Sequence, residues 1–200
     1  MPNNYQQIVK ANLKKLYNPL PENLTEALPA NQLGNCFTFE AFGEQCQIRP
    51  EGIHLGNTAE SGVLGILITL YALHANSEPE KLEPLKSFKD FPNSMPYSGA
   101  FVTHTERILI PQVEKIEKAQ TRITAKLQGR DATELAGGDF SFLVRPLPKI
   151  SLCYIFYRAD EEFPASVTCL YSSNASTFLP IDALADVGEY TSRTILTILV

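Results

Sequence analysis

The most concentrated polar chemistry in the chain is the run DEEFP at 160–164, a polar turn between two apolar segments. Neighbouring carboxylates repel one another, so they need solvent, a cation or an arginine nearby. Arg145 ends a predicted strand, and Arg158 immediately precedes the turn. The pattern permits an arginine–carboxylate network around a ligand, a weak divalent-cation site, or acid/base chemistry by Asp160 or Glu162. It equally permits a solvated turn, since surface ion pairs are common and weak.

Two further groupings have the residue types that bind anions. His104 and Arg107 lie three residues apart in a predicted helix that also follows Tyr97, so an imidazole, a guanidinium and a phenol could share one side. The run SSNAST at 172–177 places hydroxyls and an amide ahead of another predicted helix, whose N-terminus attracts anions. A solvated helix face and simple helix capping explain the same residues without a ligand.

The sequence motifs of the common enzyme classes are missing. There is no nucleophile elbow, Walker loop, dinucleotide fingerprint or HExxH pattern, and no GK[ST] follows the GVLG at 62–65. The four cysteines show no CxxC spacing and no histidine at ligand spacing, so we predict no metal site. We expect buried, reduced thiols, with a cross-strand pairing of Cys153 and Cys169 as the alternative.

Apolar periodicity predicts the elements that must position these groups. Helical spacing predicts helices over 5–17, 59–75, 98–110, about 112–127 and 180–198, and a short one within 22–30. Alternation predicts strands around 37–39, 46–48, 53–55, 139–144, 150–157 and 165–171. The segment 150–157 is apolar on both faces, which is typical of a strand covered on both sides, and the pattern of 76–97 indicates a long irregular excursion. We therefore predict an α+β fold, with a mixed or mostly antiparallel sheet and helices packed on it, in a single domain over 1–200.

Composition and charge limit the classes of partner that this chain is expected to bind. The 200 residues are 44% apolar and 20% charged, with a net charge of −5 and no basic cluster longer than Lys14-Lys15. Nucleic acids and acidic membrane surfaces are therefore not expected partners. The most hydrophobic stretch, 62–75, is too short to span a bilayer, and the N-terminus lacks a signal pattern, so we expect a cytoplasmic protein. The apolar end at 194–200 either packs into the core or forms a homodimer interface.

The C-terminal half resembles a known family, the domain of unknown function 3786 family. The resemblance rests on the Gly-Gly-Asp strand start at 137–139, the Arg-Pro-Leu-Pro step at 145–148, the DEEFP turn and the Leu-Pro-x-x-Asp helix start at 179–182. Weaker matches extend upstream to CQIRPEG at 46–52. The resemblance implies a domain found largely in anaerobic bacteria and archaea, some of whose relatives carry an attached iron–sulfur cluster domain. This chain has no cysteine spacing for a cluster, so the cofactor stays unknown.

The resemblance and the residues together support three functional hypotheses. The first is a small-ligand-binding or accessory module in anaerobic redox or one-carbon metabolism. The second is a carboxylate-based, hydrolase-like acid/base enzyme acting on a small anionic substrate, which Arg145 or His104 would hold. The third is an assembly protein that forms a homodimer. In a structural alternative, Arg145 simply braces the DEEFP turn. The candidate ligand-binding residues are Arg145, Asp160, Glu162, Asp139, Asp182, His104 and Tyr97.

Overall fold

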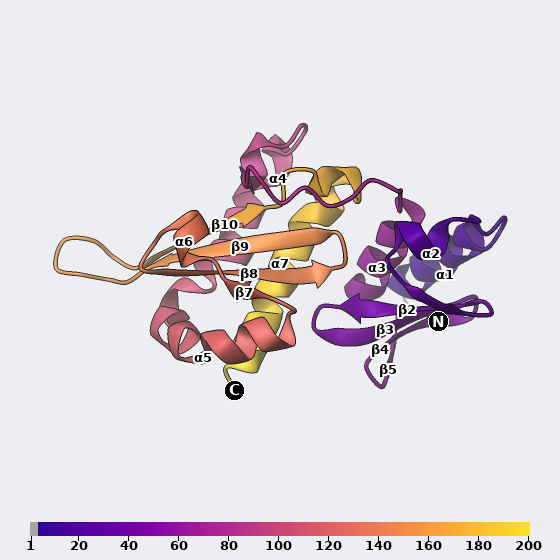
Figure 1. Cartoon of the computed structure of the whole chain (residues 1–200), viewed down its shortest axis with the longest axis horizontal. Helices are drawn as coiled ribbons and strands as arrows, with labels where there is room; N and C mark the ends of the chain where they lie inside the picture. Colours follow the sequence, from indigo (N-terminus) through magenta and orange to yellow (C-terminus); the bar gives the residue numbers. More distant parts are fainter. Residues whose placement is uncertain (1–3) are drawn as a thin grey trace.

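The N-terminal half forms a five-stranded antiparallel meander in the computed structural model, which describes residues 4–200 (Figure 1). Its strands pair in chain order: β1 (Asn31–Leu33), β2 (Cys36–Ala41), β3 (Glu44–Arg49), β4 (Gly52–Leu55) and β5 (Thr58–Glu60). Its helices are α1 (Asn4–Leu16), α2 (Leu24–Ala27) and α3 (Val63–Leu73). Alternation buries Phe37 and Phe39 on one face. There, the Phe39 ring meets Tyr71 of α3, and Phe37 meets Tyr17 just after α1.

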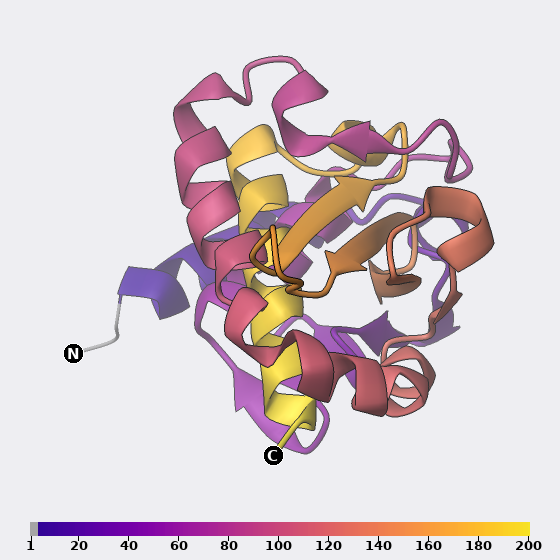
Figure 2. The same cartoon turned by 90° about the vertical axis from the view of Figure 1, so that its left-hand side faces the viewer.

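The C-terminal half forms a second antiparallel sheet of five strands, in the order β6-β10-β9-β8-β7. Figure 2 shows the molecule with this half facing the viewer. The strands are β6 (Lys86–Ser87), β7 (Arg130–Asp131), β8 (Phe140–Leu147), β9 (Ile150–Tyr157) and β10 (Ser166–Tyr171). The helices are α4 (Met95–Phe101), α5 (Val113–Lys126), α6 (Thr133–Ala136) and α7 (Ile181–Ile198). Shorter turns are η1 (Phe88–Asp90), the π-helix η2 (Val102–Arg107), η3 (Ile110–Gln112) and η4 (Ala175–Thr177).

Both faces of this second sheet are covered. On the face that we call inner, Tyr154 and Tyr171 hydrogen-bond to Ser192 and to the Leu184 carbonyl of α7. The outer face carries Leu143, Cys153 and Ile155. These three pack under Leu82 and Leu85 of the long segment between α3 and β6, and under Ala132, just before α6, and Ala136 of α6. The burial of β9 on both sides is therefore confirmed, and the long segment covers the outer face.

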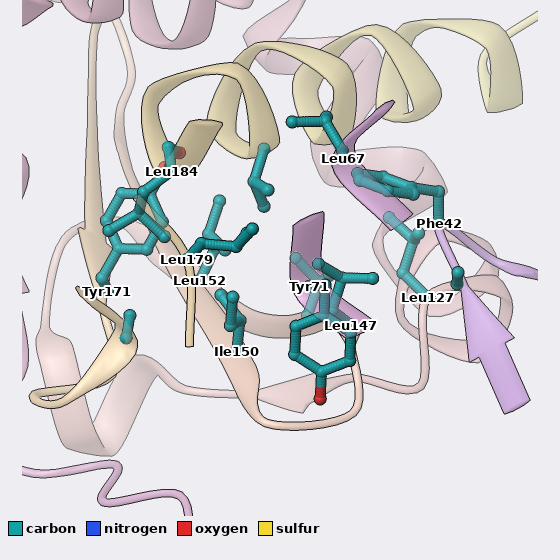
Figure 3. Close-up of a cluster of buried hydrophobic side chains, with 14 of the residues drawn as sticks. Phe42, Leu67, Tyr71, Leu127, Leu147, Ile150, Leu152, Tyr171, Leu179 and Leu184 are labelled. Carbon is teal, nitrogen blue, oxygen red and sulfur yellow. The ribbon is translucent and has the colours of Figure 1, made fainter. Parts of the chain in front are cut away.

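The two halves share one hydrophobic core. Figure 3 shows Phe42 and Leu67 of the first half close to Leu127 and Leu147 of the second. The backbone also joins the halves, because the Phe42 N–H donates to the Pro146 carbonyl at 2.7 Å. The predicted α+β class with antiparallel pairing is confirmed, although the strands divide into two sheets rather than one.

Two predicted helices begin elsewhere. The helix predicted over 59–75 starts at Val63, because Thr58–Glu60 pairs with β4 and extends the meander as β5. The helix predicted from 98 starts at Met95 and continues as the π-helix η2. At the chain's end, Ile195 is fully buried in the shared core, which confirms the packing alternative for that residue. Among residues 4–200, no helix combines the length and apolar character needed to cross a membrane.

The expectation of free thiols is confirmed for all four cysteines and that of burial for three, since Cys36 is half-buried, and the proposed cross-strand pair is wrong. All four thiols are free, and three of them are buried. In the β9–β10 register, Cys169 lies opposite Tyr154, whereas Cys153 lies opposite Leu170. Since side chains alternate between faces, this offset of one residue sends the two thiols to opposite sides of the sheet.

Candidate functional site

The DEEFP turn is held by its own atoms. The Asp160 carboxylate accepts the N–H groups of Phe163 at 2.7 Å and Glu162 at 2.8 Å, and the Asp160 N–H donates to the Phe163 carbonyl. The first two contacts lower the pKa of the Asp160 carboxyl, with the Phe163 contact contributing most. Glu162 is exposed at the same turn. This geometry is an Asx-type turn, which explains its aspartate without a ligand.

Arg158, rather than Arg145, braces the base of this hairpin. Its guanidinium forms a two-pronged pair with the Glu117 carboxylate of α5. The backbone N–H of Arg158 donates to the Asp139 carboxylate at 2.6 Å, and this carboxylate also lies 3.9 Å from the Arg158 guanidinium. The alternative in which Arg145 braces the turn is therefore wrong, because Arg145 pairs with Glu80 instead.

Three other candidates lie apart from Arg145. Tyr97 is on α4, His104 is on the π-helix η2 and Asp182 is in the first turn of α7, and all three are exposed. None of them lines the groove that is described next. Of the sequence-predicted residues, only Arg145 belongs to it.

Arg145 occupies an irregular point of β8, where the pairing with β9 shifts register between Val144 and Leu147. This β-bulge frees backbone groups for other partners. The Arg145 N–H donates to the carbonyl of Leu127, at the end of α5, at 2.8 Å. The guanidinium Nη2 donates to the Glu80 carboxylate at 3.1 Å. Arg145 is therefore fixed by its backbone at the place where the two halves of the molecule meet.

Two adjoining cavities share Arg145 and Gln128, and we call them together the Arg145 groove. The first, about 220 Å³, lies on the outer face of the second sheet and is also lined by Glu80, Leu82, Gly129, Arg130, Leu143, Val144 and Ser151. The second, about 360 Å³, extends toward the first sheet and is also lined by Pro29, Asn31, Thr38, Phe39, Glu40, Gln45 and Pro148.

Strand register explains why the charged groups of the first cavity converge. Arg130 of β7 lies opposite Leu143 of β8, so both side chains point to the outer face. The backbone at Gly129 runs very close to β8, since a Cβ at this position would lie 2.0 Å from the Leu143 carbonyl oxygen. Only glycine permits this approach, and Arg130 follows it directly. Gln128 has a positive φ of 51°, an uncommon conformation for a residue with a side chain.

The loop that carries Glu80 is tied down by the run SSNAST. The Asn174 side chain donates to the Pro79 carbonyl at 3.0 Å and accepts the Lys81 N–H at 2.8 Å. The Ser173 N–H donates to the Lys81 carbonyl at 2.7 Å. These polar groups, which the sequence suggested as an anion site, therefore position the Glu80 side chain.

A buried lysine secures the start of the same loop. The Lys149 ammonium donates to the Asn76 carbonyl at 2.7 Å and lies 5.6 Å from the centre of the Phe178 ring. The Lys149 N–H donates to the Tyr71 hydroxyl at 3.1 Å. Burial lowers the pKa of Lys149, and the Glu26 carboxylate acts in the opposite direction. Lys149 directly follows the Arg-Pro-Leu-Pro step at 145–148. Residues 145–149 therefore include both Arg145 and the lysine that secures the loop carrying Glu80.

The charges in the first cavity are unbalanced. Two guanidinium groups and one carboxylate leave it net positive, in a chain of net charge −5. Arg130 makes no ion pair with a carboxylate in residues 4–200. One oxygen of Glu80, Oε1, is buried and has no hydrogen-bond partner in the same part of the chain. The arrangement is suited to recognising a small charged molecule.

A cavity of about 400 Å³ in the N-terminal half is chemically different. It lies between α1 and the β4–β5 hairpin over an apolar floor of Val9, Leu13 and Ile53. One lysine, one arginine and two glutamates line it together with His54, so its formal charge is balanced with histidine counted as neutral. One of the glutamates, Glu60, already accepts the Gly62 N–H. No group of three or more potential metal-ligating side chains occurs within residues 4–200.

The fold and the groove define an α+β protein of two antiparallel sheets with a small cationic cavity on the outer face of the second. The chain belongs to the family described as a domain of unknown function (DUF3786), whose model matches residues 20–194. The match includes every residue of the Arg145 groove. Neither the curated proteins nor the solved structures contain a match to the chain.

Proposed function

We propose that this protein binds a small anion in the first cavity of the Arg145 groove. The observation that carries the proposal is the pair of guanidinium groups, Arg130 and Arg145, which line one cavity together with a single carboxylate, that of Glu80. Arginine recognises carboxylates and phosphates through paired, charge-assisted hydrogen bonds. Glu80 uses one of the five N–H donors of Arg145, so others are free for a ligand.

The position of the cavity also supports binding. Ligand sites often form where parts of a fold meet, and the groove runs between the two sheets. Its first cavity, at about 220 Å³, is smaller than the roughly 300–1,000 Å³ of sites for drug-sized molecules. The part of the ligand that this cavity holds should therefore be small.

Two finer hypotheses rest on the sequence alone. An accessory role in anaerobic redox or one-carbon metabolism stays a prediction of the family resemblance, and no residue of the groove is specific to either. The acid/base enzyme also stays a prediction. Its proposed carboxylates, Asp160 and Glu162, lie at an exposed turn and line neither part of the groove.

The proposal is tested by calorimetric titration of the intact chain with inorganic phosphate and with propionate. Arg145→Gln and Arg130→Gln should each weaken binding at least about tenfold, because a hydrogen bond to a charged group contributes about 1.5–3 kcal/mol. Arg193→Gln is the matched control, since Arg193 also pairs with one glutamate but lies on α7, outside the groove.

Removing Arg145 leaves Glu80 without its cation, so the double variant Glu80→Gln/Arg145→Gln separates misfolding from loss of binding. It should retain the thermal stability of the wild type while binding neither anion. If neither phosphate nor propionate binds the wild type at concentrations up to about 10 mM, the proposal is wrong.

A further inference from the structure

Glu80 has one carboxylate oxygen that lacks a donor. Its Oε2 accepts from Arg145, whereas Oε1 is buried and unpartnered in residues 4–200. The side chain is only 14% exposed. A buried carboxylate oxygen without a donor destabilises the folded chain, so such groups are rare in native proteins unless something else satisfies them. Oε1 has no surface open to a water-sized molecule, but the Glu80 side chain lines the first cavity, so a rotation of its carboxylate would bring this oxygen to a donor bound there.

The opposite charge is available in the same cavity. The Arg130 side chain forms no ion pair in residues 4–200, and the Arg145 guanidinium has N–H groups beyond the one that Glu80 accepts. A ligand that satisfies both kinds of group needs an anionic end for the arginines. It also needs an N–H donor, preferably a cation, for Glu80 Oε1.

The size of the cavity limits the rest of the molecule. A volume of about 220 Å³ corresponds to roughly seven water molecules at about 30 Å³ each, so the part of the ligand inside this cavity has fewer than about ten non-hydrogen atoms. Leu82 and Leu143 contribute apolar surface to the same cavity. A short aliphatic substituent can pack against these two side chains.

We propose that the ligand of the Arg145 groove is a small zwitterion of the α-amino-acid type. Its carboxylate binds Arg145 and Arg130, its ammonium donates to Glu80 Oε1, and its short side chain contacts Leu82 and Leu143. This inference rests on the proposed function, because it takes the anion-binding cavity as given and adds the cationic part of the ligand. It distinguishes the site from a general phosphate or carboxylate site, for which a buried glutamate would be unfavourable.

Three probes that share one carbon skeleton test the inference: propionate, L-alanine and L-alaninamide. Propionate carries only the negative charge, L-alanine carries both charges, and L-alaninamide carries only the positive charge. In calorimetric titrations of the wild-type chain, L-alanine should bind at least about tenfold more tightly than either of the others. In Glu80→Gln this advantage over propionate should shrink to less than about threefold, because the amide lacks the charge and presents a single acceptor oxygen. Glu189→Gln is the matched control, since Glu189 also pairs with one arginine but lies on α7.

The outcomes separate the two proposals. If propionate binds the wild type and L-alanine binds no better, the zwitterion inference is overturned while the anion-binding function stands. The zwitterion inference is likewise overturned if Glu80→Gln retains the full preference for L-alanine. If none of the three probes and no phosphate binds, both proposals fall. Thermal unfolding of each variant, measured alongside, ensures that a loss of binding is assigned only to folded protein.

Discussion

Removing the side chain of Asn174 should loosen the loop that carries Glu80, and with it the wall that this loop contributes to the Arg145 groove. Asn174 links the turn after β10 to a loop that lies more than ninety positions earlier in the chain. Its amide group donates to the Pro79 carbonyl at 3.0 Å and accepts the Lys81 N–H at 2.8 Å. These two contacts flank Glu80 on both sides. Asn174→Ala removes both without altering any residue that lines the cavity.

The expected loss of stability follows from the two hydrogen bonds. Each hydrogen bond of this kind contributes about 0.5–1.5 kcal/mol net, and both lie near the surface, where water replaces part of the loss. We therefore expect Asn174→Ala to lower the free energy of unfolding by about 1–2 kcal/mol. The local effect should be larger than the global one, because only the Ser173 contacts to Lys81 then link the turn after β10 to residues 79–81.

Urea unfolding measures the global change, and amide hydrogen exchange of residues 79–82 measures the local one. Asn23→Ala is the control, because Asn23 makes a single exposed hydrogen bond to Ser77 at an earlier point of the same loop. It should change the free energy of unfolding by less than about 0.5 kcal/mol. If Asn174→Ala behaves like this control and leaves exchange at 79–82 unchanged, Asn174 does not position Glu80 and the reasoning is refuted.

Three further predictions concern other parts of the fold. Gly129→Ala should destabilise the protein by about 1–3 kcal/mol in urea unfolding, because the new Cβ would clash with the Leu143 carbonyl; wild-type stability would contradict this. Burial raises the pKa of Glu106, whose carboxylate accepts the Cys169 N–H, so the charged form is unfavourable in the folded state. The stability of the wild type relative to Glu106→Gln should therefore be greater near about pH 4 than near about pH 7, and a pH-independent difference would contradict it. Ellman's reagent should find one accessible thiol in the native protein, Cys36, and all four only after unfolding; rapid reaction of Cys153 would disprove the predicted burial.

The parts of the fold that the sequence predicts are those that depend on local pattern. The apolar run at 150–157 predicts a strand covered on both sides, and β9 has that position. The turn chemistry of Asp160 is also local, since its carboxylate bonds to N–H groups two and three residues on. The local pattern misplaces the start of α3, because Thr58–Glu60 belongs to a strand through its pairing with β4. That preference comes from a neighbouring strand rather than from the residues themselves.

The site depends on contacts over long sequence distances, which no local pattern contains. The sequence identifies Arg145 as a candidate, but its partner Glu80 lies 65 residues earlier in an irregular loop. The path of that loop is set by Lys149, just before β9, and Asn174, just after β10, both at the open end of the β9–β10 hairpin. Arg130 and Ser151 join the cavity through strand register alone. The one local sign of the cavity is Gly129, which follows a predicted helix and precedes Arg130. The reason that this position requires glycine is the close approach of β8, which the sequence does not show.

The most direct test of the central claim is a map of where a small anion binds. In a titration of isotopically labelled wild-type protein with propionate, followed by two-dimensional amide NMR, we expect the shifting signals to cluster at Gly129, Arg130, Arg145 and Ser151. The signals of 160–164 should stay in place. Shifts centred on the DEEFP turn, or no saturable shifts at the four groove residues, would contradict the assignment of the Arg145 groove as the binding site.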